Sequence, residues 1–223
     1  MPFDETWETI FRSRGWGRYP SEEVVRFVAR RFPKIDDRQK VRILDLGCGG
    51  GANTWFLARD GFTVTAVDGS AAAVAQTRNL LKAEACTAEV TLRDFIDLSF
   101  PDAAFDAVLD CAAIQHNPWN DITAIHQQVF RTLKPGGWFW GMMLTADSTH
   151  GGDTDAAGVG DVRGFRAGSM EQGVLVHLFS RDEVDRLLVR YDTVSVDTVD
   201  RTDGGGAVRI AQFVVAARKP PMA

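Results

Sequence analysis

Four glycines occupy five consecutive positions, 47–51, between an apolar run ending at Leu46 and a helix-like segment beginning at Ala52. Glycines at such a junction let the backbone approach a ligand closely, beside the positive N-terminal end of the following helix. Gly47, Gly49 and Ala52 satisfy the pattern G-x-G-x-x-G/A of dinucleotide-binding folds. This short pattern alone is weak evidence for any one ligand.

Two carboxylates narrow the chemistry of that ligand. Asp68 ends the next apolar run, about 20 residues after the first glycine, where a carboxylate suits ribose hydroxyls. Asp45 lies two positions before Gly47, where its charge would oppose a pyrophosphate but suits an ammonium or sulfonium group. The loop and the two acids therefore indicate an adenosine-type cofactor, and Asp45 favours one that carries positive charge.

The elements that must position these residues alternate between strand-like and helix-like segments. Strand-like runs cover 41–47, 62–68, 88–94, 105–113 and 138–146, with helical segments at 52–61, 70–85 and 121–137 between them. This alternation predicts parallel βαβ units with helices on both faces of the sheet. After a helix at 180–190, the strand-like runs 191–202 and 208–219 are joined by "DGGG", which predicts an antiparallel hairpin. The fold class is therefore α/β, a doubly wound and mostly parallel sheet ending in a hairpin.

Two segments lie outside this alternation, although the chain is expected to form a single domain. Residues 1–40 predict a lid of two short helices, capped by Asp4 and Ser21, ahead of the main domain at 41–223. Residues 147–173 are rich in glycine and polar side chains. Because loops of this length inside a compact domain are usually functional or disordered, we expect this one to cover the substrate.

Four longer motifs identify a family resemblance. "VRILDLGCGGGANTWFLA", "AVDGS", "LRDFIDLSFPDAAFDAVLD" and "RTLKPGGWFW" resemble, in order and spacing, the signatures of class I S-adenosylmethionine-dependent methyltransferases of the small-molecule type. The resemblance covers Val41 to Leu144. It implies a seven-stranded Rossmann-like methyltransferase fold with S-adenosyl-L-methionine as cofactor and S-adenosyl-L-homocysteine as product.

The resemblance also assigns a cofactor role to individual residues. Asp45 would hold the amino group, Gly47 and Gly49 would pack against the methionine half, and Asp68 would bind the ribose hydroxyls. The remaining implied cofactor contacts are Gly69, Ser70, Asp94 and Phe95 around the adenine, and Asp110 and Gln115 beside the methionine part. Apart from the resemblance, Arg18 has a side chain suited to the cofactor's carboxylate, unless its loop is an ordinary connection between helices. Two alternatives stay open, in which Asp68 is a helix cap and Asp94 is a solvated turn residue.

The candidate catalytic and substrate-binding residues follow the fourth expected strand or lie in the two covering segments. His116 is the candidate general base, because it follows the strand ends at which ligands bind in open α/β sheets. The other candidates are His150 and His177 as weaker catalytic candidates, and Trp16, Tyr19 and Trp119 as walls of a substrate pocket. His126 falls inside an amphipathic segment and is expected to be a helix-face residue.

Composition excludes several other classes of protein. The chain has 223 residues, a net charge of −5 and three cysteines, without a signal peptide, a membrane-spanning run or a metal-ligand constellation. We therefore expect a cytoplasmic protein that binds no membrane and whose charge disfavours nucleic acid as a partner. The resemblance implies that it methylates an oxygen or nitrogen of a small molecule by in-line displacement. The sequence does not set the oligomeric state.

Three other functions are consistent with parts of the pattern. A protein or nucleic-acid methyltransferase would share the cofactor loop, and so would a non-catalytic S-adenosylmethionine-binding protein. A nicotinamide-dependent oxidoreductase would leave Asp45, Asp94 and "LKPGGWF" without a role. Cofactor binding and turnover separate these alternatives.

Overall fold

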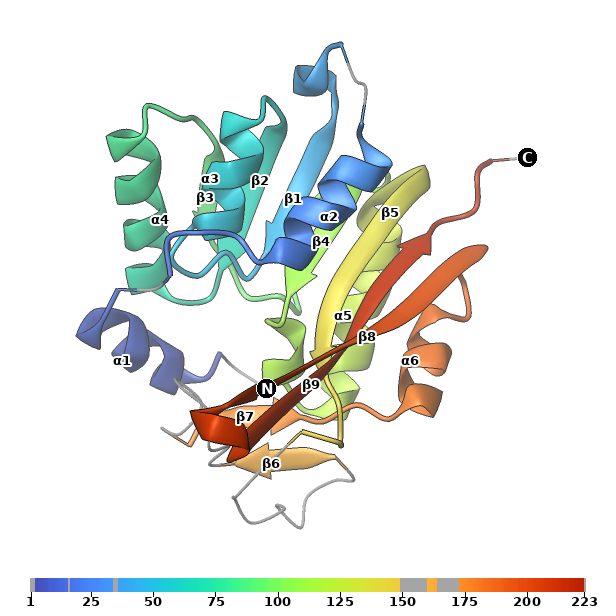
Figure 1. The fold of residues 1–223 in the computed structure, drawn as a ribbon. Helices are drawn as coiled ribbons and strands as arrows, with labels where there is room; N and C mark the ends of the chain where they lie inside the picture. Colours follow the sequence, from blue (N-terminus) through green and yellow to red (C-terminus); the bar gives the residue numbers. More distant parts are fainter. Residues whose placement is uncertain (1–2, 16, 34–35, 149–159, 164–172, 223) are drawn as a thin grey trace.

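The computed structural model describes residues 3–15, 17–33, 36–148, 160–163 and 173–222, and its centre is a seven-stranded sheet (Figure 1). The strands are β1 Arg42–Leu46, β2 Thr63–Asp68, β3 Glu89–Leu92, β4 Phe105–Cys111, β5 Leu133–Leu144, β8 Thr193–Asp203 and β9 Val208–Arg218. Their spatial order is β3-β2-β1-β4-β5-β9-β8. Strands β1 to β5 pair in parallel, and β9 pairs antiparallel with both β5 and β8. The predicted doubly wound sheet and its terminal hairpin are confirmed.

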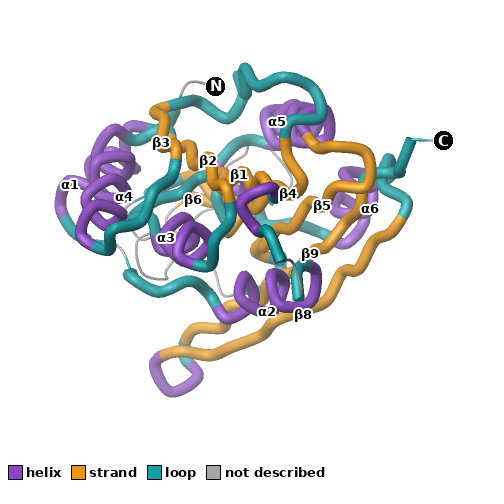
Figure 2. Tube along the Cα trace, turned by 90° about the horizontal axis from the view of Figure 1, so that it is seen from above, coloured by secondary structure: helices purple, strands orange, loops and turns teal. Residues whose placement is uncertain are grey.

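Helices cover both faces of this sheet, as seen from above in Figure 2. The helices are α1 Glu5–Ser13, α2 Glu22–Arg31, α3 Ala52–Arg59, α4 Ala71–Ala83, α5 Trp119–Thr132 and α6 Arg181–Leu188. On one face, α2, α3 and α4 contribute buried apolar side chains, and on the other α5 and α6 do so. Among the described residues, no helix combines the length and apolarity needed to span a membrane.

The helix starts predicted from the sequence are present. Asp4, Ser21 and Ser70 each accept a hydrogen bond from a backbone amide in the first turn of α1, α2 and α4. Such caps satisfy amide groups that have no partner inside the helix, and each contributes about 1 kcal/mol. They set where each helix begins and therefore where the preceding loop must end.

Residues 133–137 differ from the prediction, which placed them at the end of a helix. Helix α5 stops at Thr132, and β5 begins at the next residue. The ladder is irregular here, since Phe105 pairs with Leu133 but Ala107 pairs with Trp138. The Lys-Pro-Gly-Gly sequence therefore forms a bulged strand start, with Gly136 at φ +77° where side chains are disfavoured.

The segment 147–173 is described only in part. Its described residues include β6, Asp161–Arg163, which pairs antiparallel with β7, Leu175–His177. This two-stranded ribbon was not predicted. It lies beside α1 and the tip of the β8–β9 hairpin (Figure 1), where Ile10, Val162, Val176 and Ile210 share one apolar cluster.

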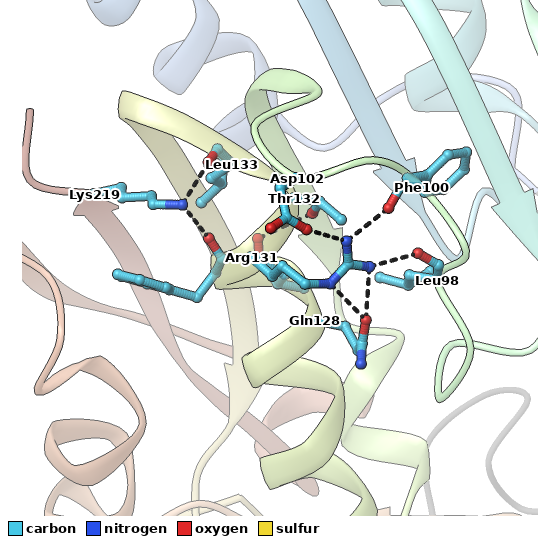
Figure 3. Close-up of polar contacts among 10 residues, drawn as sticks. Leu98, Phe100, Asp102, Gln128, Arg131, Thr132, Leu133 and Lys219 are labelled. Atoms are coloured by element: carbon cyan, nitrogen blue, oxygen red, sulfur yellow. Dashed lines mark hydrogen bonds and ion pairs between the residues drawn. The ribbon is translucent and has the colours of Figure 1, made fainter. Parts of the chain in front are cut away.

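Two cations hold the C-terminal end of α5 (Figure 3). Arg131 reaches the loop before β4, where its guanidinium donates to Leu98 O, Phe100 O and Asp102 Oδ1. The ammonium of Lys219 donates to the carbonyls of Phe130 and Leu133, at 2.8 and 2.7 Å. Positive charge is favourable at a helix C-terminus, where carbonyls lack intrahelical partners. These contacts fasten the amino edge of the parallel strands and leave the carboxyl edge to the loops.

His126 gives a test of this core. It lies on the buried face of α5 with its ring edge toward Phe139, and neither ring nitrogen has a hydrogen-bond partner among the described residues. Burial lowers the pKa of His126 to about 4. Replacing it with leucine removes two unsatisfied polar atoms, so we expect His126→Leu to raise the free energy of unfolding by about 1–3 kcal/mol at pH 8.

The difference in free energy of unfolding between His126→Leu and the wild type should increase at acid pH. Because the native pKa is depressed, the unfolded chain binds the proton first, and the wild type loses stability as the pH falls from about 6.5 toward 4. Urea unfolding of both proteins at pH 8 and pH 5 measures the difference. A leucine variant less stable than wild type at both pH values would show that His126 has a partner that stabilises it.

Candidate functional site

A cavity of about 450 Å³ opens at the carboxyl edge of the parallel strands. Its floor consists of the loops after β1, β2, β3 and β4, and its cover comes from α1 and the β8–β9 hairpin. In open α/β sheets this edge is where ligands bind. Nine of the predicted site residues line it: Tyr19, Gly47, Gly49, Asp68, Gly69, Asp94, Phe95, Gln115 and His116.

The glycine loop needs its glycines for two reasons. Gly47, Gly49 and Gly51 all have positive φ, at +80°, +52° and +90°, where side chains are disfavoured. Space is a separate constraint, because a Cβ on Gly47 would lie 2.1 Å from the Cβ of Ala113. The loop therefore presents bare backbone to the cavity at the start of α3.

Asp68 fastens this loop to the end of β2. One carboxylate oxygen accepts from the amide of Gly49 at 2.9 Å, and the other accepts from the amide of Ser70 at 2.9 Å. The side chain is buried, and this burial is the main cause that raises its pKa. Its carboxylate also lines the cavity, so the structural role and the expected ribose contact use the same group.

Asp45 and Asp110 lie behind the cavity wall. Each is fully buried and keeps one carboxylate oxygen without a partner among the described residues. The other oxygen of Asp45 accepts from Thr54 Oγ1 at 2.6 Å, and that of Asp110 accepts from the amides of Ala113 and Ile114. Burial raises the pKa of Asp45 to about 6 and that of Asp110 to about 7.

These residues fit the cofactor that the sequence implies. Buried carboxylates with unused oxygens near a polar cavity favour a ligand that carries positive charge. The bare loop leaves room for an amino-acid moiety, and Asp94 and Phe95 lie where the adenine is expected. Asp94 also accepts from the amide of Ile96 at 3.1 Å, so the turn role left open for it is real and coexists with its place in the cavity.

The other end of the cavity holds His116. Its Nδ1 lies 2.8 Å from the carbonyl of Leu175, and because a carbonyl only accepts, Nδ1 carries the proton. Nε2 therefore keeps a lone pair, and it lies 3.4 Å from Nε2 of the Gln115 side-chain amide. Burial lowers the pKa of His116 to about 4. The ring of Trp7 stands edge-on to the imidazole, with centroids 4.6 Å apart.

Four other predicted residues do not line this cavity. Arg18 forms an ion pair with Glu84 beside a separate hollow, away from the expected carboxylate site. Ser70 is buried as the cap of α4. Trp119 stacks on His177, with centroids 5.3 Å apart, so neither residue is a wall of the cavity. Trp16 and His150 lie outside the described residues, and Tyr19 lies at the rim with 74% exposure.

His177 has structural partners instead. It is fully buried, its Nδ1 lies 2.5 Å from Asp161 Oδ1, and its Nε2 lies 3.5 Å from Glu183 Oε1. Asp161 belongs to β6, His177 to β7, and Glu183 to the first turn of α6. The histidine therefore joins the small ribbon to the last helix.

Sequence reasoning missed the residues that cover the cavity. Phe3, Trp7 and Phe11 reach it from the N-terminal segment, and Arg201, Ile210 and Gln212 reach it from the hairpin. The N-terminal segment was predicted as a lid, but its amphipathic pattern did not indicate which side chains reach the cavity. The hairpin residues carry no local signal, because their place depends on how far β8 and β9 extend beyond β5. Within the described residues, no group of three or more histidine, cysteine or acidic side chains could hold a metal ion.

Comparison with known proteins identifies the domain. Residues 43–137 match a family model described as a methyltransferase domain. The chain is 38% identical over 96 residues to the 2-methyl-6-phytyl-1,4-hydroquinone methyltransferase of Synechocystis, a match covering 43% of this chain and 29% of that protein. It is 39% identical over 106 residues to the ubiquinone biosynthesis O-methyltransferase of Paramagnetospirillum magneticum, covering 46% of this chain and 40% of that protein. The chain thus spans less than half the length of either relative.

A solved structure agrees with this assignment at the level of the fold. The crystal structure of a SAM-dependent methyltransferase from Methanosarcina mazei superposes with a TM-score of 0.66 at 23% identity, covering 81% of this chain and 93% of that one. Residues 43–137 therefore match a methyltransferase domain, and the chain has the fold of a solved SAM-dependent methyltransferase.

Asp68 is the residue on which this site can be tested most directly. Asp68→Ala removes a charged acceptor of two backbone amides and the expected ribose ligand, so we expect S-adenosylhomocysteine to bind about tenfold to 100-fold more weakly. Isothermal titration calorimetry measures the change, with Asp102→Ala as the control because Asp102 is exposed beside Arg131. Unchanged affinity in Asp68→Ala, or binding of NAD in place of S-adenosylhomocysteine, would contradict this assignment of the loop.

Proposed function

We propose that this chain, whose residues 43–137 match a methyltransferase domain, binds S-adenosylmethionine as its cofactor and transfers its methyl group to an oxygen or nitrogen of a small molecule. The observation that carries the proposal is the joint cavity. The loop residues expected to hold the cofactor and the unprotonated Nε2 of His116 line the same enclosed space. A cofactor and an acceptor could therefore meet there without leaving the protein.

The bound cofactor supplies an already activated methyl group on a sulfonium sulfur. The protein's part is to orient the acceptor and to exclude water. Apolar side chains from β5 and β9, Met142, Leu144 and Ile210, line the cavity together with Trp7 of α1. They give the acceptor a dry wall, which suits a molecule with an apolar body.

His116 is suited to receive the acceptor's proton. Its low pKa keeps the imidazole neutral at ordinary pH, and the hydrogen bond to Leu175 O keeps the lone pair on Nε2. Such a weak base is sufficient for a hydroxyl acceptor, because the hydroxyl proton becomes strongly acidic as its oxygen bonds to the methyl carbon. The proton then passes from the acceptor to Nε2 late in the transfer. A neutral amine would need no base, since its nitrogen attacks with a free lone pair and keeps its proton as an ammonium.

A small acceptor is favoured over a macromolecule. The cavity is covered by α1 and the hairpin, and Arg201 is the one lining residue with a permanent positive charge among those described. The net charge of −5 also disfavours binding to a nucleic-acid backbone. The names of the two relatives refer to a hydroquinone and to ubiquinone biosynthesis, which supports a small molecule as the acceptor.

Methyl transfer can be tested with a panel of phenols, amines and carboxylic acids, using mass spectrometry to detect a methylated product. We expect turnover with at least one acceptor, and a fall in kcat of about 10²–10⁴ in His116→Gln if a hydroxyl oxygen attacks. His126→Leu is the matched control, because His126 is buried in α5 outside the cavity.

The pH profile separates a base from a merely structural histidine. With a pKa of about 4, His116 stays neutral between pH 8 and pH 5, so its protonation should not reduce kcat in that range. Full activity of His116→Gln, or a break near pH 6.5 that disappears in that variant, would contradict the proposed role. Tight cofactor binding without product from any acceptor would favour a non-catalytic binding protein.

A further inference from the structure

Gly69 leaves a notch in the cavity wall that its backbone does not require. It follows Asp68 directly, and unlike Gly47 and Gly49 it lacks a positive φ. A side chain could therefore grow from this position without backbone strain. The space is nevertheless taken, because a Cβ on Gly69 would lie 2.2 Å from Cδ2 and 2.6 Å from Cε2 of Phe3. The ring of Phe3 fills the place of the missing side chain.

The segment that carries Phe3 is fastened beside this notch. Glu8 of α1 accepts from Ser70 Oγ at 2.5 Å and from the amide of Ala72 at 3.0 Å, at the start of α4. These bonds, the one from Ala72 first, lower the pKa of Glu8 to about 2, so the carboxylate stays charged at the positive end of α4. Gln76, one turn further along α4, donates to the carbonyls of Phe11 and Arg14.

Phe3 also faces the cavity itself. It lines the same space as Asp68, Gly69, Asp94 and Phe95, the residues expected around the ribose and the adenine. Phe3 therefore brings an aromatic ring from the N-terminal segment to a cavity that already has Phe95. Aromatic rings are effective partners for the flat faces of nucleobases.

We infer that Phe3 is a cofactor-binding residue, the adenine wall that Gly69 does not provide, and that the N-terminal segment is thereby part of the cofactor site. This inference rests on the proposed function, because it presupposes that the cavity holds the adenosine half of S-adenosylmethionine. It adds that the cofactor contacts the segment leading into α1, whose Trp7 lines the same cavity beside His116.

The test is calorimetric titration of the full chain with S-adenosylhomocysteine. We expect Phe3→Ala to weaken binding about 5-fold to 100-fold, the range for loss of one base–aromatic contact. Phe3→Tyr keeps the ring and should bind within about twofold of wild type. Thr9→Ala, a change at an exposed position of α1, is the control and should bind like wild type.

Substitutions at Gly69 test the same contact from the other side. The Cβ of Gly69→Ala would strike the ring of Phe3, so this variant should lose about as much affinity as Phe3→Ala, and the double variant should lose no more than either single one. Phe3→Ala combined with Gly69→Leu refills the notch from β2 and should recover part of the affinity.

Limited trypsin digestion gives a second readout, because Arg12, Arg14 and Arg18 follow Phe3 in the chain. S-adenosylhomocysteine should slow cleavage there in wild type and in Phe3→Tyr, but less in Phe3→Ala. If Phe3→Ala binds as tightly as wild type, the inference is overturned while the proposed function stands. Tighter binding overturns it as well, because Phe3 would then be a plug that the cofactor displaces. If wild type does not bind at all, both fail.

Discussion

Three buried aspartates at one edge of the sheet are the constraint on which the rest of the site depends. Asp45, Asp68 and Asp110 come from the ends of β1, β2 and β4, and the ladder holds them together by pairing Leu46 with both Val67 and Asp110. Burial raises the pKa of each, the charge of Asp68 raises the pKa of Asp45 further, and the charge of Asp45 raises that of Asp110. The native state therefore binds protons more tightly than the unfolded chain, and these groups cost stability as the pH rises through about 6–7.

A cationic ligand would reduce the loss of stability that the three buried aspartates cause, which explains why the fold keeps them. Sulfonium and ammonium groups in the cavity would favour the charged carboxylates and draw their pKa values down. The same interaction explains the glycine loop. The carboxylates of Asp45 and Asp110 can attract a ligand above the glycine loop only if no side chain lies between them and the ligand. Gly47 has no room for a side chain beside Ala113. The helices and strands further out then need only hold this edge in place, as Arg131 and Lys219 do at the opposite one.

The cofactor half of the site was predictable because its signals are local. A strand, a glycine loop and a helix start within a few residues of one another, so Gly47, Gly49 and Asp68 could be placed from spacing alone. Phe3 and Arg201 could not, since each reaches the cavity through a segment whose docking depends on contacts far along the chain. Arg18 was misplaced for the same reason, because its partner depends on a contact far along the chain. Its residue type suited a carboxylate, but Glu84, 66 positions away, supplies one within the protein.

Some cavity residues lie inside the family match and others lie outside it, so similarity to relatives informs only on the first group. The family match spans 43–137 and includes the glycine loop, the buried aspartates and His116. Trp7, Ile210 and Gln212 lie outside it and line the same cavity, where the proposed acceptor would bind. Acceptor choice can therefore change without disturbing the buried charges. Phe3 is the exception, because it lies outside the match and yet adjoins the cofactor end, and so the covering segment can respond to whether the cofactor is bound.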